Sequence, residues 1–512
     1  MARRKFLIDY IAVMISIGFY FLRPLVLIPV ILLNMGTTSY GIWTQILTTS
    51  MLLSPLISLR LNNVLVRYLS GVENRKAISS AYLMAIIVVI VGSLILFMIS
   101  TLIGKQLTRL IYGNSELIRF LWPALAYSGS CAFFELAGAY LNTMQRQIQF
   151  AAYRTVLVLG DCLIIYLLVK ITDISACTYA LSGWQVGLSI IIFATMITQA
   201  GLAKPSFGGM PGLWPFLFSL LVSHLLSFGA ANGNLFVLVN LMGLEKIAAY
   251  QVALQIATVV GLAGAPNQYI LIPSLAEHWN RDEKEAMRSL VRLSMLILSL
   301  LAFPCIAFVV QSGPFAIHVL TGKSMNPDPT LLLMLSAGVF LSRVFQIMTY
   351  SYHLTRQIWH VLLPVGISGI INIGLPFVLV PRLGIRGAAI SYLVSMAFLV
   401  IATYRHSTLV FGTGPDWRQA YKALLIGLSI YFALWPVHTL NISENALMLL
   451  SISIAGVLWI IGFFLFNFVP FSDLKRIASL QFSFPSRSSA VDSTILSSAK
   501  NHLYQLEINK EE

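Results

Sequence analysis

The sequence has little charge. Only 10% of its 512 residues are Asp, Glu, Lys or Arg, whereas 58% are hydrophobic and the mean hydropathy is +0.83. A soluble domain carries about 25% charged residues, and a single core stops growing at about 250–300 residues. A soluble globular protein is therefore excluded. The composition predicts an all-α integral membrane protein, with lipid as the solvent for most of the chain.

Motifs of catalysis and metal binding are lacking as well. The sequence has no HExxH, GxSxG or Walker A pattern. Its four cysteines lie in apolar stretches, with no CxxC pair and no histidine at ligand spacing, so we expect buried packing residues: Cys131, Cys162, Cys177 and Cys305. We therefore expect no enzyme, no metal and no cofactor. Transport energy would come from an ion gradient, the membrane potential or the substrate gradient.

Long hydrophobic runs dominate what is present. A helix needs about 20 apolar residues to cross about 30 Å of hydrocarbon. The first run continues through Arg23-Pro24 without a small-residue cleavage site, so we expect a transmembrane helix and not a removed signal. The Ser-rich tail, 470–512, is expected to be a mostly disordered cytoplasmic segment. Fourteen spans are predicted, at 6–33, 40–70, 78–103, 117–142, 155–172, 177–201, 213–241, 249–276, 289–312, 330–353, 361–381, 387–404, 420–440 and 446–468.

Acidic residues are scarcer than basic residues. There are 33 Lys and Arg against 19 Asp and Glu, which gives a net charge of +14. With both termini in the cytoplasm, 22 basic residues fall in cytoplasmic segments, 8 in outer loops and 3 inside spans. This is the positive-inside asymmetry of membrane proteins. We interpret the charge as a topology signal and not as a nucleic-acid surface, and both termini of the multi-pass chain are predicted to be cytoplasmic.

The sequence contains an internal repeat. Arg146-Gln147-Ile148 recurs 210 residues later as Arg356-Gln357-Ile358, and Gly113 has its counterpart at Gly322, 209 residues later. Each copy would hold six spans, an even number, so the copies should share one orientation and face each other across a central cleft. The predicted domains are two six-helix bundles, two added spans and the cytoplasmic tail, at 1–205, 206–412, 413–469 and 470–512.

Three arginines fall inside predicted spans. Arg23 is in span 1, Arg60 in span 2 and Arg343 in span 10, with His224 in span 7 as a weaker candidate. A charge in mid-bilayer costs at least about 2.5–3.5 kcal/mol, so such residues should face the bundle interior or a wet cavity. Because guanidinium groups bind phosphate oxygens in bidentate fashion, a cationic cleft favours a phosphate-bearing substrate.

The acids at depth are fewer. Glu135 lies in span 4 and Asp161 in span 5. Both are candidate proton or sodium sites, since intramembrane carboxylates serve proton relays in transporters. The alternative is that acids and arginines form structural ion pairs that lock helices together. The pair considered is Arg343 with Glu135. Span 10 is the repeat partner of span 4, and the two residues lie at corresponding positions and therefore at equivalent depth.

Several stretches resemble a known family. They are the segments MGTTSYGIW at 35–43, GLEKIAAY at 243–250 and LVPRLGIRGAAI at 379–390, the last preceded by Asn372. They are similar to motifs of the polysaccharide transporter branch of the multidrug/oligosaccharidyl-lipid/polysaccharide exporter superfamily, which includes the Wzx-type O-unit flippases. The resemblance covers spans 1–12. Leu61-Asn62-Asn63 departs from the Asp-x-Gly often seen there.

The resemblance implies a flippase. Such a protein moves undecaprenyl-diphosphate-linked oligosaccharide, an O-antigen or other surface polysaccharide unit such as those of lipopolysaccharide, across the bacterial inner membrane by alternating access. Related lipid II flippases carry arginines in spans 1 and 2, at places similar to Arg23 and Arg60, and use their two added spans to form a groove for the lipid tail. The implied partners are the lipid-linked substrate, membrane lipids, a polysaccharide polymerase and a chain-length protein.

Two alternatives are considered, a second kind of transporter and a membrane enzyme. A drug or cation antiporter of the same superfamily would need an anionic cleft, which the buried arginines disfavour. A membrane glycan polymerase or ligase would place catalytic residues in a large outer loop, whereas the longest outer loop here has about 17 residues. In the flippase interpretation, polar and aromatic side chains in the cleft would contact sugar, the candidates being Trp43, Gln45, Asn232, Asn234 and Gln268.

Overall fold

The computed structural model describes residues 2–466, except 71, 73, 209, 211, 265–270, 323–324, 326–327, 356, 415–416 and 440–443. Side chains are described from residue 12, with further gaps at 272–273, 280, 358, 417, 438–439 and 444–445. Helices are the only regular secondary structure of the described residues, which confirms the predicted all-α membrane fold. Residues 1–459 form one compact unit. The predicted tail, 470–512, lies outside the described residues.

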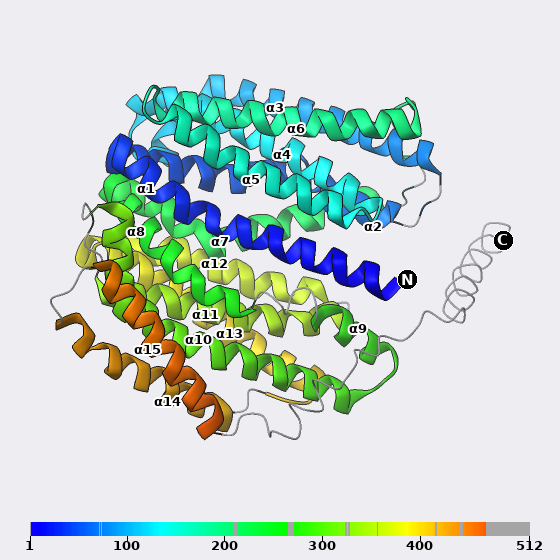
Figure 1. The fold of residues 1–512 in the computed structure, drawn as a ribbon. Coiled ribbons are helices and arrows are strands. Elements are labelled where there is room, and N and C mark those ends of the chain that lie inside the picture. Colours follow the sequence, from blue (N-terminus) through cyan, green and yellow to red (C-terminus); the bar gives the residue numbers. More distant parts are fainter. Residues whose placement is uncertain are drawn as a thin grey trace. The chain divides into compact units, whose positions relative to one another are not determined.

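The helices follow one another in the order shown in Figure 1. The first group is α1 (Ala2–Ile57), α2 (Leu61–Leu69), α3 (Arg75–Tyr112), η1 (Ser115–Phe120), α4 (Leu121–Thr143), α5 (Gln147–Leu168) and α6 (Ile174–Ala200). The second is α7 (Leu213–Met242), α8 (Leu244–Ala257), η2 (Thr258–Gly264), α9 (Ile272–Asn280), α10 (Lys284–Thr321), α11 (Pro329–Leu354), α12 (Ile358–Leu383) and α13 (Ile385–Phe411). The last is α14 (Trp417–Leu434), η4 (Pro436–Thr439) and α15 (Glu444–Leu465).

The predicted count of fourteen spans needs correction. Among the described residues, twelve helices are long and apolar enough to cross a membrane. One of them is the 46-residue stretch Ala12–Ile57 of α1. At about 1.5 Å per residue this stretch is twice as long as a bilayer core of about 30 Å is thick. Its helix is broken at Gly36 (φ 82°, ψ 176°), between the predicted spans 6–33 and 40–70. The eighteen-residue α14 is not among the twelve.

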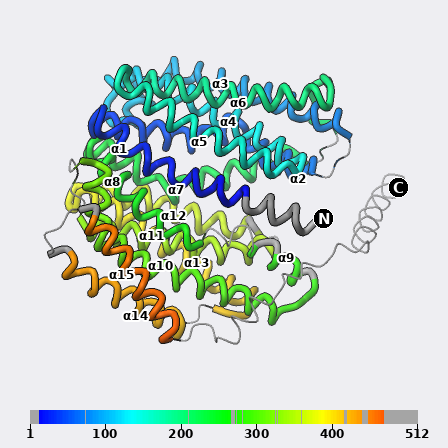
Figure 2. The backbone as a smooth tube through the Cα atoms, in the orientation of Figure 1, coloured from blue at the N-terminus to red at the C-terminus, as the bar shows by residue number. Residues whose placement is uncertain are grey.

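Two predicted spans are interrupted. The span predicted at 40–70 stops at Ile57 and resumes as α2, because Leu59 (φ 48°) and Arg60 (φ 58°) have left-handed backbones that no α-helix accommodates. The span predicted at 249–276 is divided between α8, η2 and α9. The short helices α2 and α9 begin 211 residues apart and lie at the end of the molecule where α1 begins (Figure 2).

The repeat recurs element by element. Gly36 and Gly243 (φ 79°, ψ 178°) have nearly the same backbone conformation 207 residues apart, and a new helical segment begins after each of them. Gly113 and Gly322 both end a 38-residue helix in the left-handed conformation. Only glycine adopts such angles without strain, which explains why these positions are shared. The predicted boundary at 205/206 falls between α6 and α7.

The buried cores show where the two bundles meet. The largest core combines residues of both bundles, among them Trp43 and Tyr127 of the first and Tyr250 and Leu335 of the second. A second core packs α2 to α6 with the start of α7, and a third packs α9, α10, α11 and the end of α13. The bundles therefore share one core at the Gly36 end and have separate cores toward the α2 and α9 end.

Candidate functional site

The shared end of the two bundles is tightly closed. A Cβ on Gly41 would lie 2.3 Å from the Leu244 carbonyl oxygen, so α1 approaches α8 closely enough to require glycine. The Asn240 amide of α7 donates to the carbonyl of Leu110 in α3 at 2.8 Å. The Thr38 hydroxyl lies 3.4 Å from Glu245 Oε1. These contacts seal the end opposite to the start of α1.

Arg23 is paired inside the first bundle. Its Nη2 lies 2.9 Å from Asp161 Oδ2 on α5 and donates to the Tyr127 hydroxyl on α4 at 3.0 Å. The Arg23 side chain is 12% exposed and that of Asp161 is fully buried. The Tyr127 ring packs on Trp43, with 5.9 Å between ring centroids. Arg23 therefore ties three helices together with its charge compensated, as the ion-pair alternative anticipates.

Arg60 lies in a different environment, at the interruption between α1 and α2. Its side chain is half-buried and its Nε has no hydrogen-bond partner. Glu135 of α4 is within electrostatic range but forms no ion pair with it. Instead, the Asn62 amide donates to Glu135 Oε2 at 3.1 Å. His224, on α7, is also within electrostatic range of Arg60, and its Nε2 lies 3.4 Å from the carbonyl oxygen of Leu52.

Glu135 borders a solvent-accessible space near Arg60. The residue is exposed although it lies past the middle of the apolar helix α4. A carboxylate facing lipid at such depth would be costly, so its exposure indicates a polar, wet space. Arg60, Asn62 and Glu135 come from the first bundle and His224 from the second. The site therefore lies where both bundles contribute, on the side away from the closed end.

Arg343 occupies the interruption of the second bundle. Its side chain lies across η2, where a Cβ on Gly261 would be 3.1 Å from the guanidinium and one on Gly264 would be 3.0 Å from Cδ. Nη1 donates to Gln346 one turn along α11 at 3.2 Å, and Nε is buried without a partner. Within the described residues Arg343 has no carboxylate partner, so the ion pair considered with Glu135 is not formed in this structure.

The structure thus groups the predicted site residues in three places. Arg60, Glu135 and His224 come together, Arg23 and Asp161 form a pair, and Arg343 stands apart. Sequence reasoning missed Asn62 as a partner of Glu135 and Tyr127 as a partner of Arg23. The only signal for Asn62 was its departure from a family motif, and Tyr127 carried none.

Most of the predicted sugar contacts are not accessible here. Trp43, Gln45 and Asn234 are buried, and the Asn234 amide donates to the Tyr250 hydroxyl at 2.8 Å and to the Ala388 carbonyl at 3.1 Å. Asn232 is partly exposed, and Gln268 lies outside the described residues. The four cysteines are free, and within the described parts no cluster of three His, Cys, Asp or Glu could hold a metal ion.

These features define an all-helical, multi-pass membrane protein. A structure of the lipid II flippase MurJ in an inward closed conformation matches with a TM-score of 0.65 at 15% identity, covering 90% of this chain and 99% of that one. An inward-facing multidrug resistance transporter of the MATE family, in the MOP superfamily, matches with a TM-score of 0.61 at 12% identity. The match covers 76% of this chain and 94% of that one. A structure of the MATE multidrug transporter DinF-BH matches with a TM-score of 0.57 at 15% identity. The match covers 79% of this chain and 95% of that one.

The sequence comparison identifies the family. A model of the polysaccharide biosynthesis protein family matches residues 35–327, which is more than half of the chain. The chain therefore belongs to this polysaccharide biosynthesis protein family. No curated protein matches it in sequence. The matched fold agrees with the predicted all-α membrane architecture.

Proposed function

We propose that this protein is a flippase for a polyprenyl-diphosphate-linked oligosaccharide. Its cargo would be an undecaprenyl-diphosphate-linked O-antigen unit or another surface polysaccharide unit, moved from the inner to the outer leaflet of a bacterial inner membrane. Family membership supports the polysaccharide, and the MurJ-like fold supports alternating access. The observation that carries the proposal is a pair of arginines without an ion-pair partner among the described residues. Arg60 lies at the break between α1 and α2, and the side chain of Arg343, on α11, lies against η2.

Both arginines suit a diphosphate. A guanidinium offers two parallel donors that match the oxygens of a phosphate. Arg60 also directly precedes α2, and helix N-termini carry partial positive charge that favours anions. Because a buried cation without a counter-ion is costly, the site would gain most when an anion enters. Arg23 is the weaker candidate for direct contact, since Asp161 already compensates its charge.

The same arrangement suggests how transport is coupled. In the present state the Gly36 end is closed, so cargo would enter from the side where α1 begins, which is the predicted cytoplasmic side. The opposite state must break the contacts between α1 and α8 and between α3 and α7. Glu135 is the accessible candidate for proton or sodium coupling, whereas Asp161 would have to release Arg23 first.

The decisive cellular test compares Arg60→Ala and Arg343→Ala with a matched control. Arg67→Ala is the control, because Arg67 lies on α2, the short helix that Arg60 precedes, and packs over the Phe216 ring at 4.6 Å. In a deletion strain, we expect both test variants to reduce export at least about tenfold, the effect of about 1.4 kcal/mol. Lipid-linked oligosaccharide should then accumulate on the inner leaflet.

The control variant should export normally. Unchanged export by both test variants, at membrane levels equal to the wild type, would refute a cationic site at the interruptions. Surface display of single units without polymerised glycan, in cells lacking this protein, would indicate the polymerase alternative instead.

A further inference from the structure

A fourth arginine lies inside a membrane-spanning helix. Arg154 is the eighth residue of α5, which begins at Gln147 and, with 22 residues, is just long enough to cross a bilayer. At about 1.5 Å per residue, Arg154 lies about 10 Å from the start of this helix. The helix therefore extends beyond the span predicted at 155–172, which left Arg154 among the cytoplasmic basic residues.

Arg154 lies on the inward face of α5. The residues that share this face, at spacings of three, four and seven, are Ala151, Val158 and Asp161, and all three are buried. Exposed apolar side chains cover the opposite face, at Val156, Leu159, Leu163 and Tyr166. Arg154 is half-buried. Since it lies on the inward face, the exposed part of its side chain is directed away from lipid.

Tyr20 of α1 positions the Arg154 guanidinium. The Arg154 Cζ lies 4.6 Å from the centroid of the Tyr20 ring, and Tyr20 is 45% exposed. Stacking on an aromatic ring uses the flat face of a guanidinium and leaves the N–H groups at its edge able to donate. Among the described residues, Arg154 forms no hydrogen bond and no ion pair. Its charge and its donors are therefore available to a ligand.

The duplicated fold does not require this arginine. The Arg-Gln-Ile segments at 146–148 and 356–358 set a repeat offset of 210, at which Arg154 corresponds to Pro364 in α12. The second bundle therefore forms its corresponding helix without a guanidinium at this position. A role in substrate handling explains the arginine of the first bundle better than a role in folding.

Arg154 precedes the Arg23–Asp161 pair on the path from the side where α1 begins. On α5 it lies seven residues, or about two turns, before Asp161. On α1, Tyr20 lies three residues before Arg23 and within electrostatic range of it. An anion that enters from this side therefore meets Arg154 first. Unlike Arg23, Arg154 has no carboxylate within ion-pair distance among the described residues.

We propose that Arg154 makes the first contact with the diphosphate of the lipid-linked substrate, and that Tyr20 is its positioning residue. This inference rests on the proposed function and adds a contact that Arg60 and Arg343 do not supply. The donors at the edge of the stacked guanidinium match phosphate oxygens. Because the same chemistry would also suit the phosphate of an ordinary phospholipid, the experiment compares the two ligands.

The test measures binding of a short polyprenyl diphosphate, farnesyl diphosphate, to purified full-length protein. Binding is followed by native mass spectrometry and by the melting temperature in detergent. We expect Arg154→Gln to weaken binding at least about tenfold. Tyr20→Leu should weaken it as well, because the ring that positions the guanidinium is lost, whereas Tyr20→Phe keeps the ring and should bind like the wild type.

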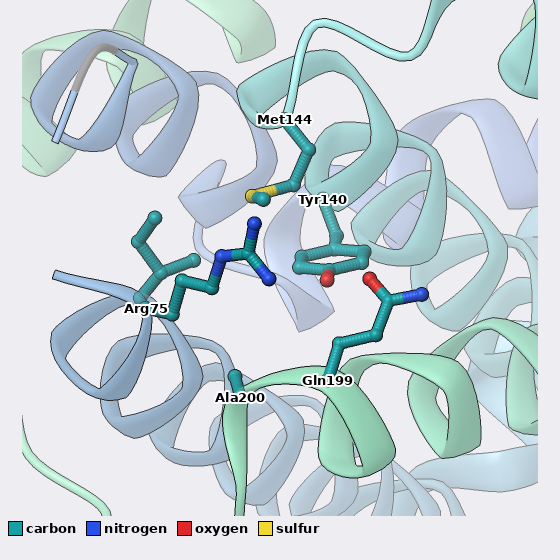
Figure 3. Close-up of a pocket in the computed structure, with 6 residues that line it drawn as sticks. Arg75, Tyr140, Met144, Gln199 and Ala200 are labelled. Atoms are coloured by element: carbon teal, nitrogen blue, oxygen red, sulfur yellow. The ribbon is translucent and has the colours of Figure 1, made fainter. Parts of the chain in front are cut away.

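Arg75→Gln is the matched control. Arg75 is another arginine of the first bundle that lies beside a tyrosine, Tyr140, as Figure 3 shows. It is exposed and is the first residue of α3, so it lies at a helix end and not inside a span. The control variant should bind farnesyl diphosphate like the wild type.

The outcomes separate this inference from the proposed function. Unchanged binding in Arg154→Gln, with binding lost in the double variant Arg60→Ala with Arg343→Ala, would overturn the role of Arg154 and leave the proposed function intact. No binding by the wild type would contradict both. If Arg154→Gln loses phosphatidylglycerol and still binds farnesyl diphosphate, the residue belongs to a membrane-lipid site and the inference is wrong.

Discussion

At the scale of single residues, the three arginines predicted within the membrane differ in what compensates their charge. Arg23 has a carboxylate 2.9 Å away, whereas Arg60 and Arg343 have none within ion-pair distance among the described residues. Depth in the membrane is thus a poor guide to the role of a buried charge. The partner decides whether a guanidinium stabilises the fold or remains able to bind an anion.

The Arg23–Asp161 pair should contribute to stability as a unit. Removing one partner of a buried pair leaves an uncompensated charge and costs about 3–5 kcal/mol. We expect Asp161→Asn to lower the melting temperature strongly in detergent, and the double variant Arg23→Gln with Asp161→Asn to recover most of the loss. A double variant as unstable as the single one would contradict a mainly pairwise role.

Glu135 should behave differently, because it is exposed and bonded only to Asn62 among described side chains. Glu135→Gln keeps the shape of the side chain, so we expect stability within about 0.5 kcal/mol of the wild type. If Glu135 couples transport to an ion, the variant should lose the dependence of transport on an imposed proton or sodium gradient. Retained gradient dependence in reconstituted vesicles would exclude this role.

At the scale of elements, the helix interruptions position the site, and two glycines, Gly36 and Gly243, position the contacts that close the opposite end. The break at 58–60 places Arg60 at the start of α2, and the turns at Gly36 and Gly243 bring α1 against α8. Alternating access requires this seal to open, so the contacts between α1 and α8 should be transient during transport.

A cross-link at the seal tests that requirement. In a background without the four native cysteines, Thr38→Cys with Glu245→Cys should be joined by a short bifunctional reagent, because their side chains meet at 3.4 Å in the closed end. We expect transport to stop on cross-linking and to return when a cleavable linker is cut. Undiminished transport in fully cross-linked protein would show that this end does not open.

Much of this element structure was predictable, and the exceptions have a physical cause. Hydrophobic length and the polar breaks between runs locate most helices, and the repeat of Gly113 and Gly322 follows from their turn chemistry. The left-handed Leu59 and Arg60 have no local signature, because neither is glycine and Pro55 lies before them. The Arg23–Asp161 pair also needs the rotation of α1 against α5, which residue spacing alone does not supply.

At the scale of the whole molecule, the predicted orientation places both termini in the cytoplasm. Reporters inserted in segments 201–212 or 281–283 should then be active only if they work in the cytoplasm, and those in 113–114 or 169–173 only if they work outside. The reverse pattern would invert the assignment of both proposed sites to membrane sides.

Our proposal requires both Arg60 and Arg343 for the movement of a diphosphate-linked glycan across the membrane. The most direct measurement reconstitutes the purified protein in vesicles with a fluorescent lipid-diphosphate oligosaccharide and follows its exposure to an impermeant quencher. We expect wild-type protein to expose nearly all of the lipid to the quencher, and the double variant Arg60→Ala with Arg343→Ala to expose only the lipid of the outer leaflet. Equal flipping by both proteins would contradict it.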